Sequence, residues 1–414
     1  NSIFAIHLMC ILANCYLLMN AIIICNNSIY SLILKCKNQK TMNKMMYLLM
    51  LLFLTQQITF AQETEKSALE KAKEAEDYGD IEMALKWYKK ASELNPKNGT
   101  TYYDITWCQN ELGLYDDAVK TATNGIKTST NAKLLYEFGY AYYKLGNYKE
   151  AIIKYKNALS VDANEHSALK GIADVYFDNK EFSKAKDYYE QCLDKSKDVS
   201  FSNYRLGYIM NEEANYQKAV DYELASLKLD SEYAPAYNEL AYAYSQLNKK
   251  SMALDNYIKA SNLNPKNAIY LSNVGDLYYG VKELEDLDKA LEYYKKSFAI
   301  ENNNAITNYR IAWILNEKEA YSEAKPYLYK AVEIDPKFAD AWIELGWIDY
   351  SEKNYKAAES DYYKALQYDS KSDLVRYYLG QVFVKQKKTK QAKKMLEELK
   401  SMNSQYAEKL EKML

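Results

Sequence analysis

The chain has 414 residues, a formal net charge of −2 and only three arginines among its 54 basic residues. This balance gives no basic surface of the kind that nucleic-acid binding requires, so we expect no nucleic-acid partner. With 12 Gly and 5 Pro, the sequence is poor in turn residues, which argues against many-turned all-β folds, and its abundant Lys and Glu favour helices.

The first 61 residues differ from the rest, because they contain no acidic residue and four of the six cysteines. Within them, Met42 and Lys44 precede an apolar run at residues 45–54, and Thr59 to Ala61 resemble a small-residue cleavage site. This is the order of a secretory signal peptide, since ten apolar residues are too few to span a bilayer. We therefore predict a signal peptide at residues 42–61 and a secreted protein that begins at Gln62. The signal and the AT-biased composition indicate the periplasm of a Gram-negative bacterium.

Residues 1–41 leave two interpretations open. They lack an initiator Met, so they are either translated upstream DNA that is never made as protein or a genuine membrane helix near residues 3–24. In the second case the flanking lysines lie on the cytoplasmic side, and the protein is membrane-anchored and faces the periplasm. Membrane contact is expected only in that case, and both interpretations place residues 62–414 outside the cytoplasm.

Small residues recur at a nearly constant spacing along the rest of the chain. The separations are 34, 33, 34, 34, 34, 37, 34, 34 and 34 residues between Ala84, Ala118, Ala151, Ala185, Ala219, Ala253, Ala290, Ala324, Ala358 and Ala392. A second small residue stands twelve positions before most of them, and a third stands seven positions after. Small side chains at fixed helical offsets let two helices pack closely, so the spacing predicts a series of helix pairs.

This pattern resembles the tetratricopeptide repeat family, in its exported bacterial type, over about residues 65–406. The family's marks appear at Gly139, Tyr142, Ala151, Tyr155 and Ala158. The resemblance implies an all-α fold, a right-handed α-solenoid of about ten antiparallel helix pairs whose first helices (helix A) line the concave side. A capping helix at about residues 404–414 should close it. Three extra residues near 282–288 predict a longer turn in the seventh repeat.

We expect residues 62–414 to form a single solenoid. Its predicted repeats span residues 65–98, 99–131, 132–165, 166–199, 200–233, 234–267, 268–304, 305–338, 339–372 and 373–406.

A longer period is superimposed on the repeats. The stretch from Asn203 matches the stretch from Asn308, and a fainter copy starts at Thr101. The chain therefore reads as one starting repeat followed by three blocks, at roughly 99–199, 200–304 and 305–406. Shared helix-A residues are explained either by a functional groove or by residual ancestry.

Aromatic side chains dominate the helix-A positions that face the groove in the family. Tyr and Trp give a large contact area at low entropic cost, although some of these rings could instead be buried against one another. We predict a ligand-binding surface made of Tyr103, Trp107, Tyr136, Tyr140, Tyr143, Phe177, Tyr204, Arg205, Tyr208, Asn211, Tyr242, Tyr279, Tyr309, Arg310, Trp313, Asn316, Trp347 and Tyr350.

The sequence predicts no enzyme, no cofactor and no metal site. His166 is the only histidine after residue 61, so no His-based triad or two-His metal site can form there, and we expect it in a surface loop. Cys108 and Cys192 lie in non-adjacent repeats and are predicted to be buried free thiols. The family's clamp for C-terminal carboxylates is disfavoured, because Asp174 stands where the clamp needs Asn.

We therefore predict a non-enzymatic scaffold that binds a partner protein or an extended peptide in its aromatic groove. The alternative is a polysaccharide-binding module in glycan export or uptake, with sugar rings on the aromatic faces and Asn110, Asn211 and Asn316 bonded to hydroxyls. Evenly spaced parallel rings would favour the sugar. Arg205 and Arg310 are predicted to grip acidic or carbonyl groups of a bound chain; alternatively, Arg205 pairs with Glu212 or Glu239.

Overall fold

The computed structural model describes residues 64–195 and 199–414, and in this part of the chain every regular element is a helix. The predicted signal peptide at residues 42–61 and the segment 1–41 lie outside the described residues. The chain divides into two compact units, one ending at Leu145 and the other beginning at Gly146. The division falls inside the third predicted repeat.

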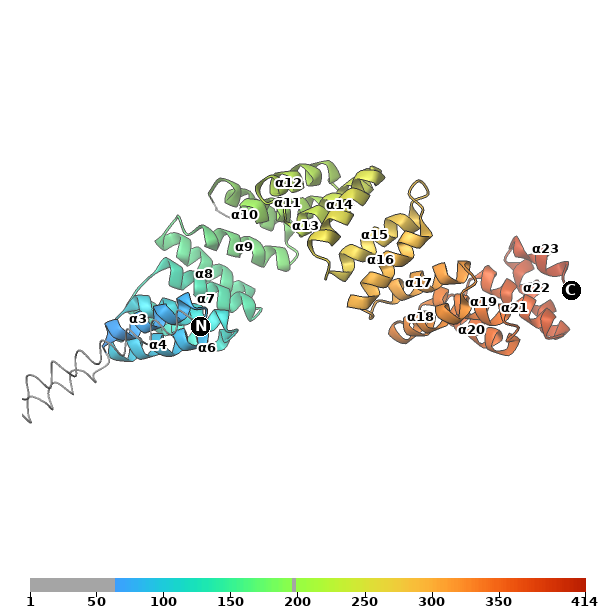
Figure 1. Cartoon of the computed structure of the whole chain (residues 1–414), viewed down its shortest axis with the longest axis horizontal. Coiled ribbons are helices and arrows are strands. Elements are labelled where there is room, and N and C mark those ends of the chain that lie inside the picture. Colours follow the sequence, from blue (N-terminus) through green and yellow to red (C-terminus); the bar gives the residue numbers. More distant parts are fainter. Residues whose placement is uncertain (1–63, 196–198) are drawn as a thin grey trace, which may run out of the picture. The chain divides into compact units, whose positions relative to one another are not determined.

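The helices of the first unit (Figure 1) are α3 (Glu65–Asp77), α4 (Ile81–Leu94), α5 (Gly99–Glu111), α6 (Tyr115–Thr128) and α7 (Ala132–Lys144). Those of the second unit are α8 (Tyr148–Val161), α9 (His166–Asp178), α10 (Phe182–Lys195), α11 (Val199–Glu212), α12 (Tyr216–Leu229), α13 (Ala234–Gln246), α14 (Lys250–Leu263), α15 (Ala268–Gly280), α16 (Leu287–Ile300), α17 (Ala305–Glu317), α18 (Tyr321–Ile334), α19 (Ala339–Ser351), α20 (Tyr355–Tyr368), α21 (Asp373–Lys385), α22 (Thr389–Ser401) and α23 (Tyr406–Glu411).

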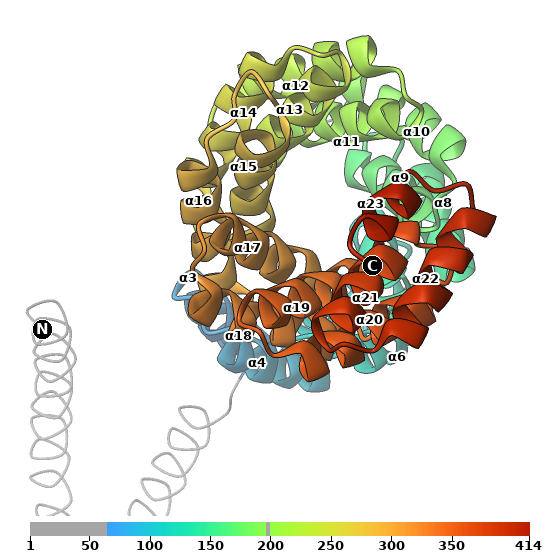
Figure 2. The same ribbon diagram turned by 90° about the vertical axis from the view of Figure 1, so that its right-hand side faces the viewer.

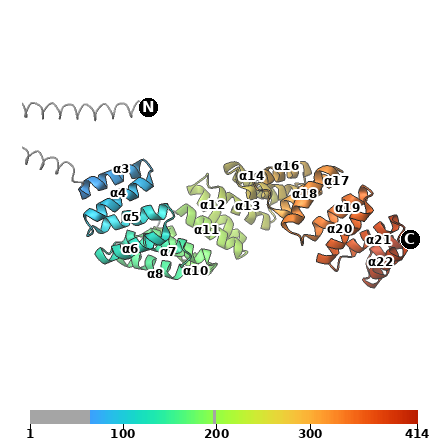
Figure 3. The ribbon, with the colours of Figure 1, turned by 90° about the horizontal axis from the view of Figure 1, so that it is seen from below.

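Within each unit, helices that follow one another in the chain pack as antiparallel pairs, which confirms the predicted all-α fold class (Figure 3). The odd-numbered helices from α3 to α21 are the first helices of the predicted repeats. Within the second unit, α11, α13, α15 and α17 lie on the inner side of the ribbon, and α12, α14 and α16 lie outside them (Figure 2). The last helix, α23, packs against α21 and α22, as the predicted capping helix should.

The recurring alanines are the centre of the core. All ten, from Ala84 to Ala392, have no exposed surface, which confirms the predicted close packing. Large rings of the second helices cover the small residues of the first: a methyl group added to Gly346 would lie 2.6 Å from the ring of Tyr362, and one added to Gly275 would lie 2.8 Å from the ring of Tyr294. Glycine at these positions lets the tyrosine ring lie directly on the backbone.

Short turns join the two helices of each repeat. The first three contain a glycine with positive φ (Gly79, Gly113 and Gly146), whereas later short turns place Lys180, Ala214, Asn248, Glu319, Lys353 and Lys387 in the same left-handed region. Asn403 adopts it between α22 and α23. The seventh repeat has a longer connection, because α15 ends at Gly280 and α16 begins at Leu287. This confirms the longer turn predicted there.

The two cysteines and the histidine singled out in the sequence all lie on helices. Cys108 and Cys192 are buried and form no disulfide with each other, as predicted. His166 is not in a loop; it is the half-buried first residue of α9, because the helix begins directly after the short connection from α8. None of the helices in the described residues is long and apolar enough to cross a membrane.

Candidate functional site

The predicted site residues all lie on odd-numbered helices from α5 to α19. We call the surface of these helices, within either unit, the helix-A face. Two of its predicted residues are exposed, Tyr242 at 40% and Trp347 at 37%, whereas Asn211 and Asn316 are buried. The others are half-buried, so most rings are shared between packing and surface.

The aromatic rings of the helix-A face contact one another at steep angles. Tyr279 and Trp313 meet with centroids 5.1 Å apart and planes at 86°, and Phe177 meets Tyr208 at 5.2 Å and 59°. Trp347 and Tyr350 are closer to parallel, at 23°. Edge-to-face contacts of this kind contribute to stability themselves, so part of the predicted surface also has a structural role.

The three equivalent asparagines bond to the next helix A, and their amide nitrogens therefore have partners inside the protein. Asn211 Nδ2 donates to the carbonyl and carboxylate oxygens of Glu239 at 3.1 and 3.0 Å. Asn110 does the same to Glu137, at 2.9 and 2.7 Å. The three blocks therefore have asparagine at this position for a structural reason. Its amide connects two consecutive repeats of one block, although the sequence placed it in the groove.

The third copy of this contact joins Asn316 to the carboxylate of Glu344 at 2.5 Å. Burial raises the pKa of Glu344 to about 7, although the Asn316 hydrogen bond acts in the opposite direction. Burial likewise raises the pKa of Glu239. These are acids held in the interior by amide donors.

Three places in the chain share one arrangement, in which a helix A packs against the pair before it. We call them the first junction (α5 on α3 and α4), the second junction (α11 on α9 and α10) and the third junction (α17 on α15 and α16). One position, directly after a half-buried tyrosine, distinguishes them: it is occupied by Asp104, Arg205 and Arg310, respectively.

At the third junction the arginine is neutralised. Arg310 forms an ion pair with Asp276 and donates a hydrogen bond to the hydroxyl of Tyr294 at 3.3 Å. That hydroxyl donates to Asp276 in turn, at 2.7 Å. The predicted binding residue Arg310 therefore has an internal acidic partner.

At the second junction the corresponding arginine has no ion pair among the described residues. The Arg205 guanidinium lies over the rings of Phe177 and Phe201, at 4.2 and 4.9 Å from their centroids, and its buried Nε has no hydrogen-bond partner there. The nearby acid, Asp174, pairs instead with Lys170 at 3.1 Å. Neither Glu212 nor Glu239, the partners considered from sequence, forms an ion pair with Arg205.

One substitution explains why Arg310 is neutralised. Ser272 occupies the position of Lys170 at the third junction, and a serine cannot neutralise Asp276, so Arg310 does. Lys170 is itself neutralised by this pairing with Asp174.

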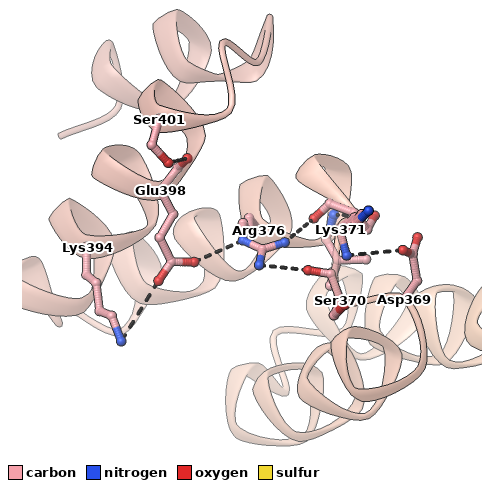
Figure 4. A network of polar contacts seen from close by, with 9 residues as sticks. Asp369, Ser370, Lys371, Arg376, Lys394, Glu398 and Ser401 are labelled. Carbon is pink, nitrogen blue, oxygen red and sulfur yellow. Dashed lines mark hydrogen bonds and ion pairs between the residues drawn. The ribbon is translucent and has the colours of Figure 1, made fainter.

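The third arginine of the chain, Arg376, has hydrogen-bond partners inside the protein for all three of its guanidinium nitrogens. Its Nε donates to Glu398 at 2.9 Å, and its two terminal nitrogens donate to the carbonyls of Ser372 and Ser370 at 2.9 Å each (Figure 4). Arg376 therefore fastens α21 to the preceding turn and to α22, and it leaves Arg205 as the arginine without such partners.

The first junction reverses the charges and is open. Asp104 replaces the arginine, Lys73 replaces the acid, and Glu76 stands where Phe177 fills the second junction. A pocket of about 390 Å³ lies here, between these side chains and Leu69, Tyr88, Tyr103 and Trp107. Glu76 accepts hydrogen bonds from Lys73 and from the Tyr88 hydroxyl, both at 2.7 Å.

Asp104 has neither a hydrogen bond nor an ion pair from its carboxylate to any described residue. Burial, and then the negative charge of Glu76, raise its pKa to about 6. Burial also acts to raise the pKa of Glu76, but the hydrogen bonds from Lys73 and Tyr88 outweigh it and lower that pKa. Asp104, Lys73 and Glu76 are not among the binding residues predicted from sequence, although the residues that follow Tyr103, Tyr204 and Tyr309 show the reversed charge.

One further acid is buried without a partner. Glu223 on α12 has no exposed surface, and neither of its carboxylate oxygens has a hydrogen bond from the described residues. It stands where α16 has Tyr294 and α18 has Leu328, against Gly207, whose added methyl group would lie 2.1 Å from Glu223 Oε1. Burial, and then Glu239, raise the pKa of Glu223 well above its ordinary value.

The repeated helix pairs and the aromatic helix-A face define a helical repeat scaffold. Three family models described as tetratricopeptide repeat match the chain, at residues 28–198, at 349–411, and at both 234–267 and 305–338. The chain is a tetratricopeptide repeat protein with many repeats. Repeats of this family generally mediate protein–protein interaction and are typically non-catalytic.

Curated relatives share the repeats over part of their length. The chain is 25% identical to the TPR repeat-containing protein MJ1428 of Methanocaldococcus jannaschii, over 56% of this chain and 45% of that protein. It is 23% identical to the BBSome complex member BBS4 of Bos taurus, over 54% of this chain and 44% of that protein. The chain thus spans less than half of each relative.

Solved structures of repeat proteins are also similar. A tetratricopeptide repeat protein from Parabacteroides merdae aligns with a TM-score of 0.46 and 17% identity, over 61% of this chain and 98% of that one. The C-terminal part of a repeat protein from Cytophaga hutchinsonii aligns with a TM-score of 0.47 and 19% identity, over 58% of this chain and 97% of that one.

Proposed function

We propose that the chain is a scaffold whose second unit binds an extended segment of a partner protein along its helix-A face. The observation that carries this proposal is Arg205, a half-buried guanidinium that lies on two aromatic rings and has no acidic partner among the described residues. A cation in this position is complementary to a carboxylate of a bound chain.

The setting of Arg205 suits such a contact. The rings of Phe177 and Phe201 hold the plane of the guanidinium, which leaves its edge available for two parallel hydrogen bonds. The side chain is already ordered, so less conformational entropy is lost when a carboxylate binds. Exposed rings at Tyr242 and Trp347 offer additional contact area on the same face.

The ring geometry favours a peptide over a polysaccharide. Stacking on successive sugar rings would be served by a series of parallel, exposed faces, whereas neighbouring rings of this face meet at 86° for Tyr279 with Trp313 and at 59° for Phe177 with Tyr208. Rings set edge to face leave apolar gaps between them, and side chains of a peptide fit such gaps better.

A random 12-residue peptide library, selected on the purified protein, tests this proposal. We expect enriched peptides that contain at least one acidic residue and that bind with micromolar affinity. Tyr242→Ala, on α13 of the helix-A face, should weaken binding of the best peptide about tenfold, as truncation of an interface aromatic commonly does.

Tyr329→Ala is the matched control, because Tyr329 is 53% exposed but lies on α18, a second helix. Its binding should equal that of the parent. The proposal fails if no peptide is enriched over selection on an unrelated protein, or if the two variants lose affinity equally.

We also propose that the scaffold acts outside the cytoplasm. Support comes only from the order of charged, apolar and small residues at 42–61. N-terminal sequencing of the protein purified from its native cells should give Gln62 as the first residue. Recovery of a peptide from residues 1–41 would contradict the interpretation that this segment is never made as protein.

A further inference from the structure

The pocket of the first junction contains an acid that has no partner. Two carboxylates line it, but only one is neutralised: Lys73 and Tyr88 both donate to Glu76, at 2.7 Å each. Asp104 is left half-buried with no hydrogen bond or ion pair among the described residues. A carboxylate that is partly removed from water and unpaired is costly, and a bound cation would remove that cost.

The walls of the pocket select an organic cation. Trp107 and Tyr103 present aromatic surface beside Asp104, and the flat, weakly hydrated guanidinium group stacks well on such surface. A divalent metal ion prefers several oxygen ligands, and no group of three or more His, Cys, Asp or Glu side chains converges anywhere in the part of the chain that is described.

Comparison with the other junctions supports the same choice. At the third junction the chain's own Arg310 occupies the equivalent position and pairs with Asp276. At the first junction the arginine is replaced by Asp104, and the ring that fills the second junction is replaced by Glu76, so that a pocket of about 390 Å³ is open. The cation of the first junction, Lys73, is bonded to Glu76, and the pocket leaves room for a second cation beside Asp104.

We infer that this pocket binds a basic side chain, arginine or lysine, of a chain that lies on the helix-A face of the first unit. Its aliphatic stem lies along Leu69 and Trp107, and its charged group contacts Asp104. The inference rests on the proposed function, in that a partner chain must reach this face, and it adds the chemistry that the first unit recognises.

Small cations test the pocket without any partner protein. N-acetyl-arginine methylamide and N-acetyl-lysine methylamide are titrated into the full chain labelled with 5-fluorotryptophan, and the fluorine resonance of Trp107 is assigned from its loss in Trp107→Phe. Either cation should shift that resonance in a saturable way. N-acetyl-citrulline methylamide, which has the shape of the arginine probe but no charge, should not.

Variants identify the carboxylate. Asp104→Asn should lower the affinity for the better cation about tenfold or more, which is the order expected for a hydrogen bond to a charged group. Asp104→Arg places the residue of the other junctions here and should abolish binding while preserving the thermal melt. Asp116→Asn, at an exposed acid of α6 outside the pocket, should bind as the parent does.

The pH dependence gives an independent readout. Asp104, with its pKa of about 6, is protonated at pH 5, while the lowered pKa of Glu76 keeps that group ionised and paired with Lys73. Binding should therefore weaken several-fold between pH 7.5 and pH 5 in the parent, and this dependence should vanish in Asp104→Asn.

The inference is overturned if neither cation saturates the Trp107 signal, if citrulline shifts it equally, or if Asp104→Asn binds as the parent does. None of these results depends on whether the library selection on the second unit succeeds, so failure of the pocket and failure of the proposed function are distinguishable.

Discussion

The second and third junctions carry the same Tyr-Arg pair on equivalent helices, yet only one of the two arginines is neutralised. Arg310 pairs with Asp276 because α15 has Ser272 where α9 has Lys170. At the second junction Lys170 takes the acid, and Phe201 replaces Ile306 beneath the guanidinium. Two substitutions around an unchanged arginine thus convert an internal ion pair into a cation available to a partner.

The same two blocks differ again one helix further on. In the second block, α12 follows the helix of Arg205 and packs Glu223 against Gly207. In the third block, α18 carries the fully buried Leu328 at the equivalent position. The second block therefore holds an unpaired acid inside and an unpaired arginine at its surface, and the third block holds neither. We expect the second block to be the less stable of the two, and the following variants test that difference.

The largest effect is expected at Glu223. Glu223→Leu, which copies the third block, should raise the free energy of opening of α11 and α12 by about 2–3 kcal/mol at pH 8, because it removes a buried acid that has no partner. Hydrogen exchange of peptides from these helices measures this locally, which suits a repeat protein whose unfolding need not be two-state.

The pH dependence of this effect has a definite sign. The pKa of Glu223 is raised in the folded state by burial, so the folded protein retains a proton that the unfolded chain releases above its ordinary pKa. Stability is highest below that ordinary pKa and falls as pH rises toward the folded value. The gain from Glu223→Leu should therefore be larger at pH 8 than at pH 5. Glu213→Gln, at an exposed acid, should show no such trend, and a gain that is independent of pH would contradict the assignment.

The next largest change in stability is expected at the asparagine–glutamate contacts. Asn316→Leu should cost about 1–3 kcal/mol, because it leaves the carboxylate of Glu344 without its amide donor. Asn211→Leu should cost less, because Glu239 keeps a hydrogen bond from Asn238 at 3.1 Å. Hydrogen exchange of peptides from α19 and α13 measures the two losses of stability. Equal losses, or a larger loss for Asn211→Leu, would show that these amides do not hold the acids as described.

The two arginines should also differ in their contribution to stability. Arg310→Met should cost about 1 kcal/mol, the upper end for a partly exposed ion pair, because it leaves Asp276 with only the Tyr294 hydroxyl. Arg205→Met should change stability by less than about 0.5 kcal/mol, since the methionine still packs on Phe177 and no acid loses a partner. Thermal melts of both variants measure this difference. A larger loss of stability for Arg205→Met than for Arg310→Met would mean that Arg205 is mainly structural.

A small and equal effect is expected where the two blocks are alike. Ala214 and Glu319 both hold positive φ, at 57° and 59°. Replacing either with glycine should stabilise by about 0.5–1 kcal/mol, because glycine adopts this region without the steric penalty of a Cβ. The two gains should match in melts, and a clear difference would indicate that the turns of the two blocks are not equivalent.

The sequence was sufficient for the fold because the repeat signal is local and redundant. Ten alanines in register predict ten close helix contacts, and each of them is fully buried. The same periodicity placed the predicted binding residues on helix A. It could not separate surface from interior there: Asn211 and Tyr204 share a helix with Arg205, but the amide of Asn211 bonds to Glu239 and Tyr204 is in edge contact with Tyr233.

Charge pairing was the part that sequence could not supply. Whether an arginine has an acidic partner depends on whether a lysine already pairs with the nearby acid. That lysine lies in a different helix, as Lys170 does. The aligned blocks show that Asp104, Arg205 and Arg310 occupy one equivalent position. Whether each of them forms an ion pair follows only from the side chains that pack around it.

The central claim is that Arg205, and not Arg310, is available to an acidic group of a bound chain. Isothermal titration of the best acidic peptide from the library into Arg205→Lys and Arg310→Lys tests it most directly, since both changes keep the charge and remove only the paired donors of arginine. We predict that Arg205→Lys weakens binding by about 1–3 kcal/mol and that Arg310→Lys leaves the affinity unchanged. Equal losses in the two variants, or an unchanged affinity in Arg205→Lys, would contradict the account.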